Sequence, residues 1–514
     1  MDTHSYARVG PNPKFKPQGG YHCASVGKRG PCPAGVPSSC VAPRPPPHLT
    51  SHAPLAVFDG DGYVVAVHFG DKADAVTVSS AWVKTARLQF ESQVGKAVLP
   101  KLGDMHGLTG LALLAVEGAK KAVGAPAASI ESAMGTANTA LEFHAGRLLA
   151  LNEGDVPWHL RVLCEGALET LGACRFNGTL GTPTFTAHPK VDHTTGKLCY
   201  FGYQIDKAPH CTYGVMDAAG EVVHTTAVPL RWGQMMHDFS ITASKAVFWD
   251  TPLKFDPQVM VSKDALPFAF DKALGTRFGV LPRAGEGVTQ TQWFDVPGCM
   301  IFHSLGAWDD EASNTVKLLA CRMENFSLDL PPADGKEWQP RNVDGGAPTL
   351  FEWTLDLETG VATQQCVVPL PAGVTGMDFP TKHPYLTGRP FRFGYLALFA
   401  GLEITGVAKV DVLTRQIVGQ VDFPEGSSAG ECFFVPRHDG PPADGAHEDD
   451  GFLLTYVNTV ETTACWVLDA KTMAAQPLAV IQLPHRAPWG FHSLFVSKAR
   501  LATQAAASGG GTPA

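Results

Sequence analysis

Four histidines in this sequence share one context, because each interrupts a run of apolar, β-branched or aromatic residues. They are His188 in TPTFTAHPKVD, His237 in RWGQMMHDFSIT, His303 in CMIFHSLGAWDD and His492 in PWGFHSLFVSK. An unpaired imidazole inside an apolar strand costs free energy, so such a side chain is normally hydrogen-bonded or bound to a metal. For one histidine alone, a hydrogen-bonded core position is the commoner explanation. Four of them predict a common partner, and neutral imidazoles suit a first-row transition metal.

The four histidines lie too far apart in the chain for a zinc finger or a helical HExxH site. Distant strands must therefore bring them together. Beyond about Gly135 the chain has the pattern of short strands and tight turns, and one phrase recurs: an apolar residue, Asp, two residues, then Thr and Gly or an equivalent. It occurs at Asp192, Asp356, Asp411 and Asp469. The later intervals are a little longer than the roughly 40–50 residues of common propeller blades, whose inner strands converge on one axis.

Composition limits the classes of protein that need to be considered. The chain has 514 residues, 45% hydrophobic and 17% charged, which is enough for a sizeable core. A net charge of −9 without a long Lys/Arg run argues against a nucleic-acid partner. No run approaches the roughly 20 apolar residues of a membrane span. The 12 cysteines form no CxxC pair and are typical of reduced core residues. No targeting signal is readable, and we expect the cytoplasm or a plastid.

We predict a single propeller domain over residues 1–503, followed by a low-complexity tail at residues 504–514. Within the domain, the Pro-rich residues 23–54 predict a disordered insertion. The Asp-Gly turn in LAVFDGDGYVVAVHF predicts a hairpin from Leu55 onwards. Leu and Ala at helical spacing over residues 101–124 predict a helix.

Several motifs together resemble the carotenoid cleavage oxygenases, which are non-haem iron enzymes. They include GPNPKFKPQGGYH, FDGDG, GTANTALEFHAGRLLALNEGDVP, FTAHPKVD, MMHDFSIT, RFGVLPR, FHSLGAWDD and GFHSLFV. The motif WDTPL at residues 249–253 is most similar to the plant-type 9,10(9′,10′) branch. The resemblance implies an all-β, seven-bladed β-propeller with a small helical or loop cap over an axial site. It also implies that the four histidines hold Fe(II) there.

A histidine ligand needs an acceptor for its second ring nitrogen, so carboxylates should surround the centre. The resemblance assigns that role to Glu153 in ALNEGDVP, Asp378 in MDFP and Glu431 in AGECFFVP. At the second of these three positions many relatives have Glu. The shorter side chain of Asp378 reaches its histidine only if the backbone lies closer or a water bridges the two groups. Each acid alone would otherwise be interpreted as a solvated loop residue. Thr139 in GTANTAL matches a position near an open coordination site of the iron in relatives.

The resemblance implies oxidative cleavage of a conjugated C=C bond in a carotenoid or apocarotenoid by O2, giving aldehydes or ketones. Two alternatives remain. An animal branch of this fold is an isomerohydrolase that uses its iron as a Lewis acid on retinyl esters. The chain also starts inside the family pattern, so a catalytically impaired propeller that binds or scaffolds is the other alternative. Trp308 is a candidate for lining a substrate tunnel, and core packing explains it equally well.

A lipophilic substrate raises the question of membrane contact. The run GLTGLALLAV at Gly107–Val116 is too short to span a bilayer, but its leucines could lie in the headgroup layer. Lys101, Lys120 and Lys121 flank the run and would add attraction to anionic lipid. The alternative is that the same leucines pack against the propeller. Relatives are thought to dock through a helical region here, which favours peripheral binding.

Overall fold

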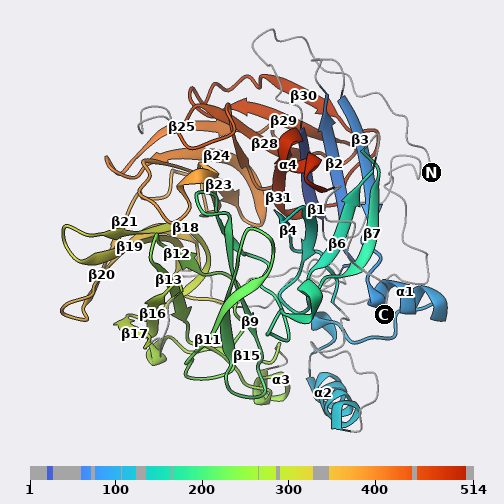
Figure 1. Ribbon diagram of the computed structural model, residues 1–514, viewed down its shortest axis with the longest axis vertical. Coiled ribbons are helices and arrows are strands. Elements are labelled where there is room, and N and C mark those ends of the chain that lie inside the picture. Colours follow the sequence, from blue (N-terminus) through green and yellow to red (C-terminus); the bar gives the residue numbers. More distant parts are fainter. Residues whose placement is uncertain are drawn as a thin grey trace.

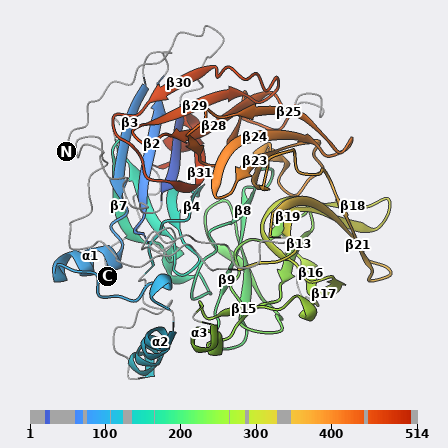
Figure 2. The same ribbon diagram turned by 180° about the vertical axis from the view of Figure 1, so that it is seen from behind.

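The computed structural model of this chain is built almost entirely of antiparallel strands (Figure 1). It describes residues 20–26, 60–70, 76–105, 107–122, 135–163, 166–263, 265–284, 290–327, 346–442 and 448–504. Sheets of four or five strands follow one another around the molecule in chain order, as both views show (Figures 1 and 2). This arrangement is a β-propeller, so the predicted all-β propeller class is confirmed.

One sheet joins the two ends of the described chain through β1 (Gly20–Val26), β2 (Tyr63–Phe69), β3 (Val76–Trp82) and β31 (Gly490–Ser497). The next sheet comprises β4 (Ala140–His144), β5 (Arg147–Leu151), β6 (Trp158–Val162) and β7 (Leu168–Ala173). It is followed by a sheet of β8 (Lys190–Asp192), β9 (Lys197–Tyr203), β10 (Cys211–Met216) and β11 (Val222–Val228). The sheet after them comprises β12 (Ser240–Ile241), β13 (Lys245–Asp250), β16 (Thr276–Pro282) and β17 (Gln292–Val296).

The remaining large sheets comprise β18 (Met300–Asp310), β19 (Thr315–Met323), β20 (Thr349–Asp356) and β21 (Ala362–Cys366), then β22 (Gly376–Thr381), β23 (Phe393–Ala400), β24 (Glu403–Asp411) and β25 (Gln416–Asp422). The five-stranded sheet contains β26 (Ser428–Ala429), β27 (Phe433–Pro436), β28 (Gly451–Asn458), β29 (Thr463–Asp469) and β30 (Ala479–Gln482). A two-stranded sheet pairs β14 (Leu253–Phe255) with β15 (Phe268–Phe270).

Helices are short and few in the described part of the chain. The α-helices are α1 (Ala86–Val94), α2 (Gly107–Ala122), α3 (Gln258–Lys263) and α4 (Lys498–Ala502). The 3-10 turns are η3 (Leu102–Asp104), η6 (Phe176–Gly178), η7 (Lys272–Leu274) and η8 (Pro384–Leu386). In Figures 1 and 2, α2 and α3 lie together at the outer edge of the ring of sheets. The predicted cap over the axis stays a prediction.

The ring is closed by strands from both ends of the described chain. Strand β1 pairs antiparallel with β2 on one side and with β31 on the other. Several contacts across sheet boundaries join strands at the inner edges of the sheets: β31 with β4, β12 with β18, β18 with β22, and β27 with β31. Residues on these innermost strands therefore meet near the axis although they are far apart in sequence.

Burial differs between middle and outer strands, and the sequence pattern follows it. Every residue of β28 is buried, as expected for a strand covered by neighbouring sheets on both faces. The outer strand β11 alternates between partly buried and exposed residues, because one of its faces lies in solvent. Apolar clusters fill the spaces between adjacent sheets, such as the one that contains Trp249, Phe278 and Trp353.

The recurring Asp phrase forms tight turns between paired strands. At Asp356, Asp411 and Asp469 the carboxylate accepts hydrogen bonds from backbone N–H groups two and three residues later, just after the third strand of its sheet. This self-bonding turn is typical of Asp. Asp192 makes the same kind of turn between the first and second strands of its sheet instead. The Asp motif therefore marks this type of turn wherever it occurs. Only its last three copies lie at equivalent positions in their sheets.

Several predicted boundaries shift. The predicted helix at residues 101–124 is split into η3 and α2. Residues 23–26 continue β1, so the predicted insertion at 23–54 does not begin at residue 23, and its remainder lies outside the described residues. The first strand of the predicted hairpin, residues 55–59, also lies outside the described residues. Its second strand is β2, which pairs with β1 and β3. In the predicted tail, the Gln504 side chain bonds both backbone groups of Val162, and the rest is not described.

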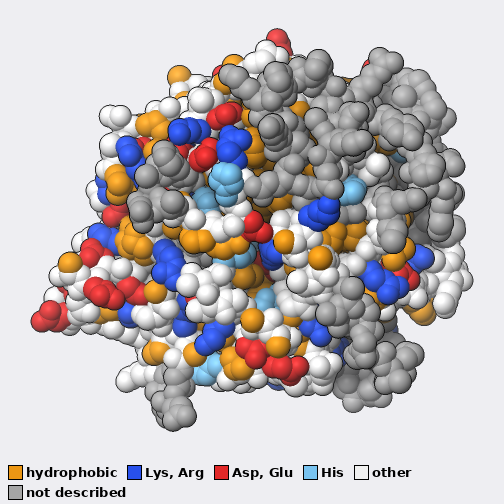
Figure 3. Space-filling model, turned by 45° about the horizontal axis from the view of Figure 1, so that its top comes forward, with side chains coloured by type: hydrophobic (Ala, Val, Ile, Leu, Met, Phe, Trp, Pro, Cys, Tyr) orange, Lys and Arg blue, Asp and Glu red, His pale blue; other side chains and the backbone are white. Residues whose placement is uncertain are grey.

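On the face seen in Figure 3, acidic and basic side chains are interspersed over the described surface. This mixture accords with the modest net charge of −9. None of the helices in the described residues has both the length and the apolar character that crossing a bilayer would require.

Candidate metal centre

The structure brings the four predicted histidines together at the axis. His188 and His237 precede the innermost strands β8 and β12, whereas His303 lies in β18 and His492 in β31. One ring nitrogen from each lies within 4.8 Å of the others. The Nε2 atom of His237 is 3.0 Å from Nε2 of His188 and 3.1 Å from Nε2 of His303. We call this group the imidazole cluster.

Each predicted carboxylate lies behind one imidazole. The Nδ1 atom of His237 is 2.8 Å from Glu153 Oε1, and Nδ1 of His303 is 3.0 Å from Asp378 Oδ1. For His492 the Nδ1 atom is 3.4 Å from Glu431 Oε1. An Nδ1–H that donates to a carboxylate leaves the Nε2 lone pair facing the centre of the cluster. Among the described residues, His188 has no such carboxylate partner.

Asp378 reaches His303 directly, so no bridging water is needed. The pairing of β22 with β23 shifts register just after Asp378, and Phe379 has a positive φ of 49°. The same Asp378 oxygen also accepts the Phe379 N–H at 2.8 Å. This irregularity turns β22 at the point where the shorter side chain must approach the imidazole, because a bulge redirects neighbouring side chains.

Phe379 was missed by the sequence reasoning. Its ring lies 4.9 Å from the ring of His303 and 5.1 Å from the ring of His492, centroid to centroid. It therefore fills the space between two ligand candidates. A phenylalanine directly after a carboxylate of the MDFP motif was the available signal.

Polar residues directly behind the histidines tie neighbouring sheets together. Asp238, next to His237, forms an ion pair of 2.6 Å with Lys190 and accepts from the backbone N–H and hydroxyl of Ser304. Ser493, next to His492, donates its backbone N–H to Glu431 at 2.8 Å. The signal in the sequence was the polar residue that follows each histidine within two positions. These contacts fix the backbone from which the imidazoles project.

Thr186 anchors the histidine that lacks a carboxylate. Its hydroxyl accepts the backbone N–H of His188 at 2.9 Å and donates to the carbonyl of His237 at 3.4 Å. Thr139 lies beside the fourth histidine, because its carbonyl accepts the backbone N–H of His492 at 3.3 Å. The predicted role of Thr139 near an open coordination position stays a prediction.

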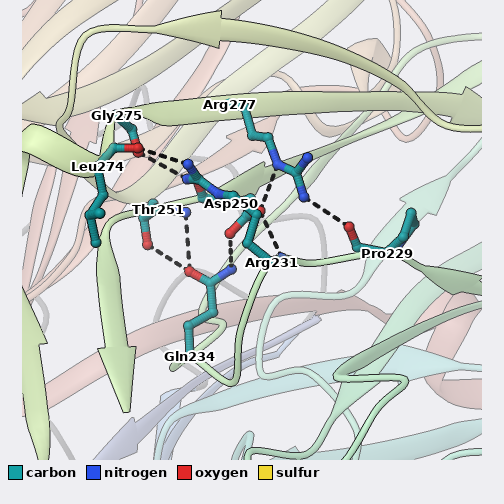
Figure 4. A network of polar contacts seen from close by, with 8 residues as sticks. All are labelled: Pro229, Arg231, Gln234, Asp250, Thr251, Leu274, Gly275 and Arg277. Carbon is teal, nitrogen blue, oxygen red and sulfur yellow. Dashed lines mark hydrogen bonds and ion pairs between the residues drawn. The ribbon is translucent and has the colours of Figure 1, made fainter. Parts of the chain in front are cut away.

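A separate network holds the segment that leads to His237 (Figure 4). The buried carboxylate of Asp250 accepts from the Nε atoms of Arg231 at 3.0 Å and Arg277 at 2.7 Å. It also accepts from the side chain of Gln234, which bonds Thr251 in turn. Because a buried charge is stable only when paired, this network defines the course of the chain just before the ligand candidate.

The electrostatic surroundings differ among the imidazoles of the cluster. Burial and the three neighbouring imidazoles hold the pKa of His188 well below its usual range. Burial raises the pKa of Glu153, but the facing His237 outweighs it and the pKa is lowered. For His303, burial lowers the pKa and Asp378 reverses this, so the pKa is raised. Four imidazoles this close cannot all be protonated, so the cluster is suited to share a cation.

The residues present fit a transition-metal ion. Four converging nitrogen donors are typical of a borderline first-row metal, and their other nitrogens are oriented by carboxylates. The second oxygen of Glu153 is buried and has no hydrogen-bond partner among the residues that the structure describes, so positive charge nearby would compensate it. The donor set alone does not choose among the divalent metals of this group.

Two different environments adjoin the cluster. The first is a cavity of about 260 Å3, which we call the polar cavity after the two lysines in its lining, Lys190 and Lys382. Imidazoles of the cluster also line it, and apolar side chains such as Phe379 and Phe434 form much of the rest. The second is a row of aromatic rings in contact, Phe302, Phe326 and Phe270, which we call the aromatic path. A further ring pair, Phe255 and Phe268, belongs to the same β14–β15 sheet as Phe270. None of these rings is among the described residues that line the polar cavity. Trp308 belongs to neither, since it packs against Phe391 beside a core cluster.

Comparisons with known proteins agree with this architecture. The family model described as retinal pigment epithelial membrane protein, RPE65, matches residues 5–497. The chain is 35% identical to carotenoid 9,10(9′,10′)-cleavage dioxygenase 1 of Arabidopsis thaliana, over 97% of this chain and 85% of the relative. The fold is similar to that of the lignostilbene dioxygenase of Pseudomonas brassicacearum, with a TM-score of 0.75 and 24% identity over 96% of this chain and 95% of that one. It is also similar to that of a Synechocystis apocarotenoid oxygenase variant, with a TM-score of 0.73 and 21% identity over 97% of this chain and 96% of that one. The chain therefore belongs to the RPE65 and carotenoid cleavage oxygenase family.

Proposed function

We propose that this protein is an Fe(II)-dependent dioxygenase that cleaves a conjugated C=C bond of a carotenoid or apocarotenoid, at the 9,10(9′,10′) position, into carbonyl products. The observation that carries the proposal is the imidazole cluster with a carboxylate behind three of its four rings. The name of the Arabidopsis relative supports the substrate class and the bond. No nucleophile or acid–base pair is required for this reaction.

The four histidines would hold the iron through Nε2, and bound Fe(II) would supply the binding and activation of O2. The chain's own contribution is to aim these nitrogens at the centre of the cluster. Glu153, Asp378 and Glu431 hold the Nδ1 protons on the far side of their rings. Burial disfavours imidazolium at His188, where no carboxylate compensates a positive charge among the described residues.

The aromatic path offers a surface for a long apolar polyene. Phe302 meets the ring of His237 edge-on at 5.1 Å, and Phe326 lies 5.2 Å from Phe302. Phe270 follows at 6.5 Å from Phe326 and belongs to β15, which pairs with β14. Such a row excludes water from the substrate and sets its register relative to the cluster. The double bond that is cleaved would be the one that this register aligns with the metal.

We further propose that a lipid surface is the peripheral partner, and that α2 contacts it. Leu108 is 70% exposed, Val116 is 50% exposed and Leu111 is 38% exposed, so much of this apolar helix is not covered by the propeller. Helix α2 lies against α3, where Gly110 approaches Met260 closely, and α3 connects β14 to β15 of the aromatic path. An apolar helix at this point would bring a lipid-dissolved substrate to the path.

The lysines expected to flank this helix contribute less than the sequence indicated. Lys101 is buried and Lys120 forms an ion pair of 2.6 Å with Glu117, whereas the side chain of Lys121 lies outside the described residues. Burial of apolar side chains, at about 25 cal/mol per Å2, would therefore dominate membrane binding over charge attraction.

We also propose that the ring has seven blades. Each of the sheets that begin with β4, β8, β12, β18 and β22 would be one blade. The five-stranded sheet, and the sheet shared by β1 to β3 and β31, would complete the ring. In the second of these, strands from both ends of the described chain pair with each other, as ring closure requires.

The test is to load the purified protein with Fe(II) and incubate it separately with β-carotene, zeaxanthin and an apocarotenal under isotopically labelled O2. The expected result is cleavage products whose masses identify the bond, with label in the carbonyl oxygens. A retinyl ester assay in parallel distinguishes the isomerohydrolase, which would isomerise and hydrolyse the ester without using O2. Absence of turnover with iron bound would contradict the enzyme and favour a binding protein.

A further inference from the structure

The polar cavity contains two lysines whose surroundings differ. It extends from the imidazoles of the cluster to Tyr385 and the exposed Asp439, which bond each other at 2.6 Å. Lys190 and Lys382 both line it. The amine of Lys190 forms an ion pair of 2.6 Å with the buried carboxylate of Asp238. This contact holds the amine against the neighbouring carboxylate.

Lys382 follows β22 and has no carboxylate or carbonyl in contact with its amine among the described residues. The amine instead lies over the ring of Phe391, whose centroid is 5.3 Å from Nζ. The stem passes Gly306, where a Cβ atom would lie 2.8 Å from Cε of Lys382. The missing side chain at Gly306 therefore leaves the space in which the lysine extends along the cavity wall.

This environment makes the neutral amine of the partly buried Lys382 accessible near neutral pH. Burial is the main cause that lowers the pKa of Lys382, and the positive charge of Lys190 lowers it further. The negative charge of Glu448 raises it in part, and the resulting pKa is about 7. A neutral amine is a nucleophile, whereas the protonated amine of an ordinary surface lysine is not. The cleavage that we propose for the neighbouring centre produces aldehydes.

We propose that Lys382 is a covalent capture site for conjugated aldehydes, forming an imine through Nζ inside the polar cavity. The inference rests on the proposed function only for the source of the aldehyde. The nitrogen lone pair forms a bond to the carbonyl carbon while the C=O π bond breaks and its oxygen takes a proton. The resulting carbinolamine then loses one water as the C=N bond forms. No electrons are gained or lost, and hydrolysis by water reverses the step.

The experiment uses the full-length, metal-loaded protein with added aldehyde, so that labelling does not depend on turnover. The probes are sorbaldehyde, a short conjugated dienal, and retinal, each followed by borohydride. A reduced imine adds the mass of the aldehyde less one water plus two hydrogens, which distinguishes it from conjugate addition. Peptide mapping is expected to find this adduct on the peptide that contains Lys382. Labelling that is spread over exposed lysines, or absent, overturns the proposal.

Two variants give matched controls. Lys382→Arg retains the positive charge but cannot form an imine, and loss of the adduct is expected. Lys190→Arg alters the other cavity lysine, and retention of the adduct is expected. Metal content and thermal unfolding of both variants show whether the cavity is intact, and an adduct that survives Lys382→Arg overturns the assignment. Cleavage without labelling contradicts only this inference, whereas labelling without cleavage contradicts only the proposed function.

Discussion

On one side of the imidazole cluster, Phe302 and Phe326 begin a row of aromatic rings; on the other, Lys190 and Asp238 form an ion pair in a cavity that also contains Lys382. Strand β18 contributes to both environments. Phe302 contacts the ring of His237 and belongs to the aromatic path, whereas His303 and Ser304 line the polar cavity. The pairing of β18 with β19 shifts register between Ile301 and Ser304, so an irregular part of this strand lies where the two environments meet.

We propose that the two sides divide the work. A polyene gains from contact with rings and from exclusion of water, and the aromatic path offers both. Small polar species and carbonyl products require hydrogen bonds and charge, which the polar cavity offers. The predictions below test this division, beginning with the centre that both sides share.

Replacing any one of the four histidines by Ala is expected to abolish cleavage and to lower iron content well below one atom per chain. The imidazole cluster serves both sides, so no route can bypass it. Iron analysis and product detection are the measurements, and far-UV circular dichroism should remain that of a β-protein. A variant that kept full iron and full activity would remove that histidine from the centre.

The carboxylate variants Glu153→Gln, Asp378→Asn and Glu431→Gln are each expected to lose roughly 10–100-fold in metal affinity or activity, because they orient ring nitrogens without binding the metal. The loss should be smallest for Glu431, whose separation from its imidazole is 3.4 Å, against 2.8 Å for Glu153. Iron titration is the measurement.

Glu448→Gln provides the control for this series, because Glu448 is a buried carboxylate that accepts backbone N–H groups of Arg392 and Phe393 away from the cluster. Its iron affinity should equal that of the unaltered protein. Equal affinity in all three test variants as well would mean that the carboxylates do not support the centre.

Phe302→Ala is expected to raise the KM for a carotenoid about tenfold, since a truncated aromatic side chain gives up on the order of 1.5 kcal/mol of apolar contact. Iron content should stay near its original level. The matched change on the polar side is Tyr385→Phe, which removes a hydroxyl that bonds Asp439 and should leave this KM unchanged. If both variants changed the KM equally, the aromatic path would not be the substrate side.

The smallest effect is expected at α2. Changing Leu111, Leu113 and Leu114 to Ser should reduce liposome binding while thermal stability is retained, because Leu111 is exposed and the other two are only partly buried. Leu413→Ser is the control, since Leu413 is also exposed but lies in a turn after β24. Loss of solubility or of stability in the triple variant would instead indicate that these leucines pack against the propeller.

The sequence alone was enough to identify the fold class and the chemistry-bearing residues. The histidines interrupt apolar runs, which predicted a shared partner before any geometry was known. The repeated Asp turns indicated a propeller, because turn chemistry is local and therefore visible in the sequence. Family motifs supplied the three carboxylates, and all three lie beside imidazoles.

Tertiary structure decided what depends on contacts between distant strands. Whether Asp378 could reach its histidine depended on an irregularity in β22, and the fates of Lys190 and Lys382 depended on whether a neighbouring sheet supplied a carboxylate. The predicted start of the insertion at residue 23 was wrong, because residues 23–26 belong to β1, whose pairing with β31 joins opposite ends of the described chain. Local residue patterns record strand and turn preferences, whereas the pairing of a charge and the polarity of a cavity are set by residues that only the closed ring brings together.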